Sequence, residues 1–197
     1  MDLIITACRA LAHQPRLRLL RAIHERPDRT VQTLAEEVGL PVAATSLHLK
    51  LLRGLHLIQT TPSGRYVRCS PARPGSTQNG FLRELQTLVS DLFGAGSLNR
   101  TLLKVCDSIP QAPQDWDAVF EALRKHVTTF THLRRLLILR WLAQRGPCRP
   151  EQITSGIGMS ADAARRQLGK LQRRGVIAPA PGSPGAWTLV RTVHPPC

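Results

Sequence analysis

The sequence predicts a mainly α-helical fold with small β-hairpin wings, built from two similar repeats with a helical linker between them. Three observations predict it. One pattern recurs 119 residues later, apolar residues recur at helical spacing in both copies, and each copy ends in β-rich runs around a Gly-containing turn. The chain has 197 residues, 42% of them hydrophobic, which is enough for one or two compact domains.

The internal repeat aligns residues 11–58 with 130–177 without a gap. Eleven of the 48 aligned positions are identical, and Gly39 and Gly158 form one such pair. Duplication of one ancestral unit is the simplest explanation. The predicted domains are a first repeat over 1–75, a helical linker over 76–113 and a second repeat over 114–197.

Residues that favour helix ends mark the first two helices of the first copy. Pro15 suits a first helical position, and apolar residues follow it at helical spacing. They are Leu17, Leu20 and Ile23. Thr30 can cap a second, short helix that runs through Glu37 and ends at Gly39.

The third helix of this copy and a hairpin after it complete the unit. The helix is predicted from about Val42 to Leu55, and its inward-facing residues are Thr45, Leu49 and Leu52. Residues 57–61 and 66–69 are typical of two strands, and the turn between them contains Gly64. This order of three helices and a hairpin predicts a winged helix-turn-helix.

Several segments of the chain resemble the arsenic-repressor (ArsR) family of bacterial transcription regulators. In the first copy they are 10–20 (ALAHQPRLRLL), 34–36 (LAE), 46–53 (SLHLKLLR) and 64–65 (GR). In the second, more diverged copy they are 130–135 (FTHLRR) and 164–171 (ARRQLGKL). The resemblance implies a dimeric repressor whose third core helix enters the DNA major groove and whose wing grips the backbone.

The linker is predicted to be helical and to need a partner. Between Asn79 and Gly94 the apolar residues form one broad stripe, which must be buried. The stripe consists of Phe81, Leu82, Leu85, Leu88, Val89, Leu92 and Phe93. The resemblance implies a dimerisation role for this helix. Further helices are predicted over 98–106 and from Asp115 onward.

A second apolar stripe distinguishes the helix after residue 132. Leu133, Leu137 and Trp141 replace polar or small residues of the first copy, opposite a core face. That face is formed by Leu136, Leu139 and Leu142. We expect this stripe to be buried by the linker helices or by another subunit.

The charge of the chain favours a polyanionic partner. Lys and Arg number 27 against 13 Asp and Glu, which gives a net charge of +14. Residues 1–70 carry +5, residues 71–113 carry +1 and residues 114–197 carry +8. Double-stranded DNA is the leading partner; an acidic membrane, an acidic protein or a solvated basic surface remains an alternative.

The predicted DNA-binding residues lie on the third helix and wing of each copy. In the first copy they are Ala44, Ser46, Leu47, Lys50, Arg53, Arg65 and Arg68. In the second copy they are Arg165, Arg166, Lys170 and Arg173, with Arg174 beside them. Leu47 can contact a thymine methyl group, and arginine can bind guanine or phosphate. The tip of the second hairpin, 181–185, has no cation.

We expect no enzyme, no cofactor and no metal site. The sequence has no P-loop, HExxH, GxSxG or dinucleotide fingerprint. Metal sensors of the resembled family would place Cys at 30–38 or His at 81–93, and neither segment has them. The five cysteines show no zinc or disulfide spacing, although Cys8 and Cys106 could form a redox pair. No segment is apolar enough to span a membrane, and no signal peptide is evident, so we expect a cytoplasmic protein.

The sequence therefore predicts a DNA-binding transcription regulator, a repressor that occupies operator DNA with two winged helix-turn-helix modules. One chain could act as a pseudodimer on successive major grooves, or two chains could form a homodimer. The alternatives are a tandem winged-helix adaptor for protein interaction and an architectural DNA-binding protein. RNA binding is less favoured because only 4% of the residues are aromatic.

Overall fold

The computed structural model describes residues 1–73, 75–94 and 116–190. They fall into two compact units, one of Arg9–Lys125 and the other of Met1–Cys8 with His126–Cys197. The helix predicted over 98–106, the helix start at Asp115 and Cys106 lie outside the described residues. Within the described part, no helix has both the length and the apolarity needed to cross a membrane.

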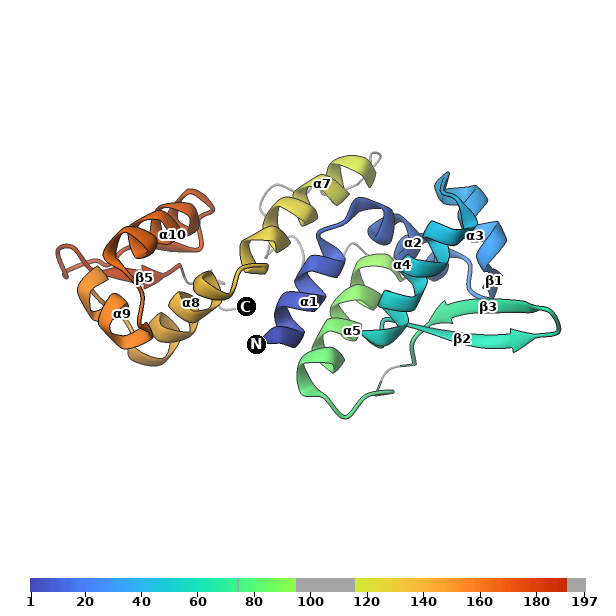
Figure 1. The fold of residues 1–197 in the computed structure, drawn as a ribbon, viewed down its shortest axis with the longest axis horizontal. Coiled ribbons are helices and arrows are strands. Elements are labelled where there is room, and N and C mark those ends of the chain that lie inside the picture. The colour runs from blue at the N-terminus through green and yellow to red at the C-terminus, as the bar shows by residue number, and fades with distance from the viewer. Residues whose placement is uncertain (74, 95–115, 191–197) are drawn as a thin grey trace, which may run out of the picture. The chain divides into compact units, whose positions relative to one another are not determined.

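The first unit contains most of the helices and a small sheet (Figure 1). Its elements are α1 (Asp2–Leu11, shared with the other unit), α2 (Gln14–Glu25), β1 (Arg29–Thr30), α3 (Val31–Val38), α4 (Val42–Gly54), β2 (Ile58–Ser63), β3 (Tyr66–Pro71), α5 (Gly80–Phe93) and α7 (Trp116–Val127). The strands form an antiparallel sheet in the order β1-β3-β2. In its register Thr61 lies opposite Arg68, and Arg68 in turn lies opposite Thr30.

The local signals for α3 are confirmed. The Thr30 Oγ1 accepts a hydrogen bond of 3.2 Å from the backbone N–H of Thr33, which satisfies one free donor at the start of the helix. Gly39 ends the helix with a φ of 70°, a left-handed conformation that glycine adopts without strain. These two residues fix the two ends of α3, and Gly39 also forms the turn toward α4.

The core of the first unit lies between α2, α3 and α4. Its fully buried side chains include Leu20, Ile23, Leu34 and Leu52. The linker helix α5 also packs on α2, and the Gln86 side chain donates hydrogen bonds to the His56 carbonyl (2.6 Å) and to the Ser76 Oγ (2.9 Å). Part of the apolar stripe of the linker is therefore buried within its own unit.

Most of helix α7 belongs to the first unit, whereas residues 114–197 are predicted to form the second repeat. Phe120 is 2% exposed, and its ring centroid lies 5.7 Å from that of Trp116 and 6.3 Å from that of Phe93. The Arg18 Nη2 donates hydrogen bonds of 2.9 Å to both carboxylate oxygens of Asp117. These aromatic and ionic contacts explain the difference, because they bring α7 against α5 and α2.

The second unit repeats the order of three helices and a hairpin. Its elements are η1 (Thr128–Phe130), α8 (Leu133–Arg145), α9 (Pro150–Ile157), α10 (Ala161–Arg173), β4 (Ile177–Pro179) and β5 (Trp187–Leu189). The two strands pair antiparallel. Its core is formed by Ile138, Leu142, Cys148, Ile153, Leu168, Leu171 and Ile177.

The three residues of the apolar stripe predicted on α8 are not all buried, and they do not share one environment. Leu133 is 46% exposed, and Leu137 is half-buried. Trp141 instead packs inside its own unit, with its ring against Gly156 of α9 and the Arg145 guanidinium 4.3 Å from the ring centroid. The expected burial by the linker or by another subunit is therefore unnecessary for Trp141.

We expect Gly156→Ala to destabilise the protein by about 1–3 kcal/mol, because the core has no room for a methyl group there. A Cβ at Gly156 would overlap the indole of Trp141, so the ring would have to leave its position in this packing. Urea denaturation followed by Trp fluorescence measures the change. Gly169→Ala is the matched control, since a Cβ there meets nothing within 4 Å and alanine favours a helix. Equal midpoints for the two variants would contradict this packing.

Candidate nucleic-acid interface

Helix α4 has one buried face and one exposed face. Thr45, Leu49 and Leu52 are buried in the core, and the Thr45 Oγ1 donates a hydrogen bond of 3.1 Å to the Pro41 carbonyl. Leu47, two residues from both Thr45 and Leu49, points away from that core and is 69% exposed. Among the other predicted residues of α4, Ser46, Lys50 and Arg53 are also exposed, and Ala44 is half-buried.

The hairpin β2–β3 follows α4 directly and is joined to it by Arg53. The Arg53 Nη1 donates a hydrogen bond of 3.3 Å to the Thr60 Oγ1 of β2. Arg65 lies in the exposed turn of the hairpin, with its guanidinium 4.9 Å from the ring centroid of Tyr66. The exposed cation of the wing therefore lies at its tip, where it is free to contact the phosphate backbone of DNA.

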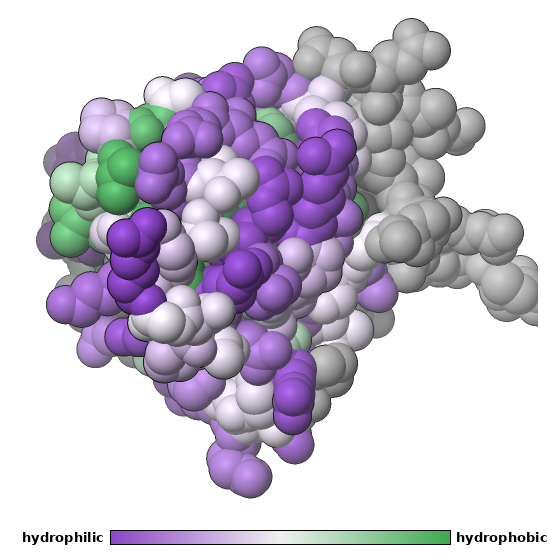
Figure 2. Space-filling view, turned by 90° about the vertical axis from the view of Figure 1, so that its right-hand side faces the viewer, coloured by the Kyte–Doolittle hydropathy of each residue, from purple (hydrophilic) through white to green (hydrophobic). Residues whose placement is uncertain are grey.

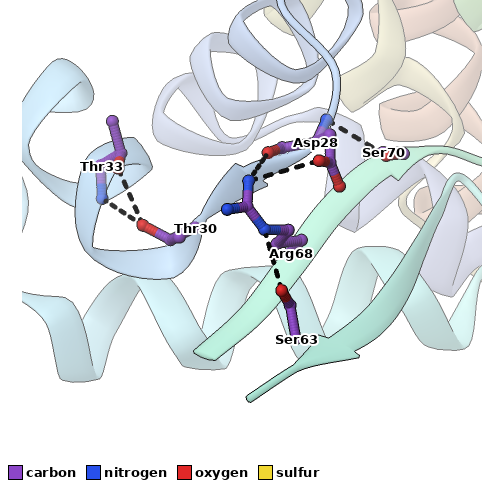
Figure 3. A network of polar contacts seen from close by, with 6 residues as sticks. All are labelled: Asp28, Thr30, Thr33, Ser63, Arg68 and Ser70. Atoms are coloured by element: carbon purple, nitrogen blue, oxygen red, sulfur yellow. Dashed lines mark hydrogen bonds and ion pairs between the residues drawn. The ribbon is translucent and has the colours of Figure 1, made fainter. Parts of the chain in front are cut away.

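Arg68, which is predicted as a DNA contact, is half-exposed and links the wing to neighbouring segments of its unit (Figure 3). Its Nη1 donates hydrogen bonds to the backbone carbonyl (2.9 Å) and carboxylate (3.3 Å) of Asp28, and its Nε donates one to the Ser63 Oγ (3.3 Å). The Asp28 N–H in turn donates to the Ser70 Oγ at 3.2 Å. The guanidinium thus joins the hairpin to the segment between α2 and α3.

Helix α10 of the second unit carries a different set of exposed side chains. Ser160 caps it, accepting a hydrogen bond from the Ala163 N–H at 3.4 Å. The predicted residues Arg165, Arg166, Lys170 and Arg173 are all exposed. Arg165 is 81% exposed and forms an ion pair of 3.3 Å with Asp162.

Arg174, beside this set, has a structural role within the second unit. Its Nη1 donates hydrogen bonds to the hydroxyl oxygens of Thr128 (2.7 Å) and Thr129 (3.0 Å). It therefore joins the end of α10 to the 3₁₀ turn before α8. The sequence did not reveal this role, because the partners lie 46 and 45 residues away.

The first unit presents a largely polar surface on the side of its hairpin. Figure 2, which faces the hairpin end of Figure 1, shows hydrophilic residues over most of this face and a small apolar group at its left. The exposed apolar side chains of α4 are Val42 (50%), Leu47 (69%) and Leu51 (37%). Helix α4 thus exposes apolar side chains together with the cations Lys50 and Arg53, and the DNA major groove offers both apolar and hydrogen-bonding contacts.

A histidine pair lies behind the exposed face of α4. The rings of His13, at the start of α2, and His48, on α4, are 5.0 Å apart. Burial lowers the pKa of both imidazoles, with a further lowering from nearby Arg16 and, for His13, from His48. Arg16 itself donates to the backbone carbonyls of Ala10 (2.5 Å) and Arg9 (2.7 Å), so it is fixed beside the pair.

We expect the protein to lose stability as the pH falls from 7.5 to 5.5. Both histidines have a lower pKa in the folded state than in the unfolded state, so the unfolded state binds more protons in this range. The contribution of the two histidines to the free energy of unfolding is complete above their unfolded-state pKa of about 6.5. It is lost as the pH falls through their lower pKa in the folded state. Urea midpoints across this range measure the loss. The double variant His13→Gln/His48→Gln should reduce the dependence without abolishing it, because burial also lowers the pKa of His24 and His126. An unchanged slope would contradict the assignment to His13 and His48.

Two features of the described residues bear on metal binding and on thiol chemistry. No cluster of three or more His, Cys, Asp or Glu side chains suited to a metal ion occurs among them. Burial raises the pKa of the Cys8 thiol to about 11, so this cysteine is not an activated thiolate at neutral pH.

Comparison with known proteins identifies the first helix-turn-helix. Residues 13–60, which span α2 to the start of β2, match the family model of the bacterial regulatory proteins of the arsR family. A solved structure of reduced HlyU from Vibrio cholerae N16961 is similar over 47% of this chain and 90% of that one, with 21% identity and a TM-score of 0.36. The comparison with curated proteins found no match. Over residues 13–60 the chain is thus similar to the helix-turn-helix domain of the arsR family.

Proposed function

We propose that the chain is a DNA-binding transcription repressor that occupies operator DNA with two winged helix-turn-helix modules. The arsR-family match over 13–60 carries the proposal, because it coincides with the helices that expose Ser46, Leu47 and Lys50 on α4. Helix α4 contains no acidic residue, and the chain carries a net charge of +14. A basic surface on this motif fits the DNA backbone and groove.

The second module is supported by the internal repeat and by the side chains of α10. The order α8, α9, α10 and hairpin follows that of α2, α3, α4 and hairpin, and we attribute this to an ancestral duplication. Arg165, Arg166, Lys170 and Arg173 on α10 are exposed cations of the kind that contact bases and phosphates. The proposal includes no catalytic step and places the protein in the cytoplasm.

The proposal is tested by selection from genomic DNA. The full chain is incubated with sheared DNA of its own organism, and the retained fragments are sequenced. Enrichment of a few upstream regions that share one motif supports an operator-binding regulator. Retention without any sequence preference would replace it with an architectural role, and no retention at low salt would favour the protein-interaction adaptor.

The number of chains on one site distinguishes a pseudodimer from a homodimer. Two modules in one chain can bind successive major grooves about one helical turn apart. We propose this arrangement, and light scattering of the complex with a single-site duplex tests it. One chain per duplex supports the pseudodimer, and two chains per duplex support a homodimer on a longer site.

We expect Arg65→Ala and Arg68→Ala to differ in the salt dependence of DNA binding. Loss of a phosphate contact by Arg65 should lower the slope of log K against log salt by about 0.9. Arg68 is occupied by Asp28 and Ser63, so its loss should leave the slope unchanged and lower the melting temperature of the free protein. Anisotropy titrations and thermal melts measure the two effects. If Arg68→Ala also lowered the slope of log K against log salt by about 0.9, Arg68 would contact a phosphate directly.

A further inference from the structure

The two exposed helix faces differ at their central position. Leu47 of α4 and Arg166 of α10 lie at equivalent places in the 119-residue repeat. Each is exposed and lies two residues before a buried leucine, Leu49 or Leu168. The same point of the two helices therefore presents an apolar side chain in one module and a guanidinium in the other.

These side chains suit different features of the major groove. Leucine can neither donate nor accept a hydrogen bond, and the apolar feature that bases present there is the C5-methyl group of thymine. Arginine donates two parallel hydrogen bonds and fits the O6 and N7 acceptors of guanine. The difference between Leu47 and Arg166 is therefore a difference in the base that each can recognise.

The surroundings of Leu47 favour DNA as the partner of this apolar group. Lys50 is exposed one turn further along α4, and Arg53 follows in the last turn of the helix. Arg65 lies exposed at the tip of the adjoining hairpin. Exposed apolar side chains and cations side by side on a helix without acidic residues complement a polyanion whose groove contains methyl groups.

We propose that the two modules recognise different bases: α4 contacts thymine methyl groups through Leu47, and α10 binds guanine through Arg166. This inference rests on the proposed function. It assigns the operator an asymmetric form, with a thymine-dependent half under the first module and a guanine-dependent half under the second. A symmetric palindrome would not satisfy both helices of one chain.

Base analogues test the proposal on the duplex recovered from genomic selection. Replacing thymine by deoxyuridine removes only the methyl group, and we expect about fourfold weaker binding at the contacted position. Replacing guanine by 7-deazaguanine removes the N7 acceptor, and we expect at least about fivefold weaker binding. Anisotropy titrations of the full chain, one substituted position at a time, locate both halves.

Two variants assign each effect to its side chain. In Leu47→Ala the deoxyuridine effect should disappear and the 7-deazaguanine effect should remain, and Arg166→Ala should show the reverse. Both residues are exposed, so neither change removes core packing. If the wild type binds selectively but no base analogue weakens binding more than twofold, this inference is wrong and the proposed function still holds. Absence of selective binding overturns both.

Discussion

Reversal of Arg165 and Arg166 to glutamate is expected to weaken selective DNA binding by about 100-fold or more. Both side chains are exposed on α10, and the tip of the following hairpin, residues 181–185, has no cation to compensate. A good bidentate contact contributes about 1–3 kcal/mol, and each 1.4 kcal/mol is about tenfold in affinity. The glutamates would also repel phosphate oxygens. Anisotropy titration against the selected duplex measures the loss.

The matched control for this reversal is the double variant Arg73→Glu/Arg83→Glu. It changes the net charge by the same amount through two exposed arginines that lie on neither α4 nor α10. We expect a much smaller loss of affinity, which reflects only the weaker overall field. If both double variants lost the same affinity, the binding would depend on net charge and α10 would have no special part.

Phe120→Ala is expected to destabilise the protein by about 3–5 kcal/mol, because it opens a cavity between α7 and the rest of the first unit. The ring is 2% exposed and contacts the rings of Phe93 and Trp116. Urea denaturation followed by Trp fluorescence measures the effect, since Trp116 lies in the same cluster.

Glu121→Ala is the control for this cavity. It changes the next residue of α7, which is exposed and forms a surface pair with Arg124, so we expect a midpoint near that of the wild type. If Phe120→Ala lowered the free energy of unfolding by less than about 1 kcal/mol, the surrounding side chains would have to fill the cavity, or α7 would not pack as described.

The parts of the fold that depend on neighbours in sequence were predictable. Thr30 and Gly39 mark the ends of α3 because a cap and a left-handed turn are local requirements. The inward face of α4 followed from helical periodicity, and Thr45, Leu49 and Leu52 are buried as predicted. The strand β1 was missed because two residues are too few to show alternation.

Contacts between distant segments were not predictable from the same signals. The contact between Arg68 and Asp28 was not predicted, because the two residues lie 40 positions apart and are brought together by the pairing of the hairpin with β1. Trp141 is predicted to be buried by the linker helices or by another subunit, whereas its ring packs against Gly156 inside the second unit. In both cases tertiary packing decides which face of an element a long side chain uses.

The exposed cations of α10 were easier to predict than the interior of its unit. A run of Arg165, Arg166, Lys170 and Arg173 cannot be buried without partners, so its exposure follows from charge alone. The histidine pair of His13 and His48 had no comparable signal, because each residue is ordinary on its own helix. Only the packing of α4 against the start of α2 brings the two rings together.

Sequence-selective DNA binding is tested most directly by an anisotropy titration of the full chain at several salt concentrations. The two ligands are the selected duplex and a shuffled duplex of equal composition. We expect much tighter binding to the selected duplex at every salt concentration, with a log–log slope of about 0.9 per phosphate contact. Equal affinity for both duplexes, or no binding at low salt, would contradict the assignment of this protein as a sequence-selective DNA-binding regulator.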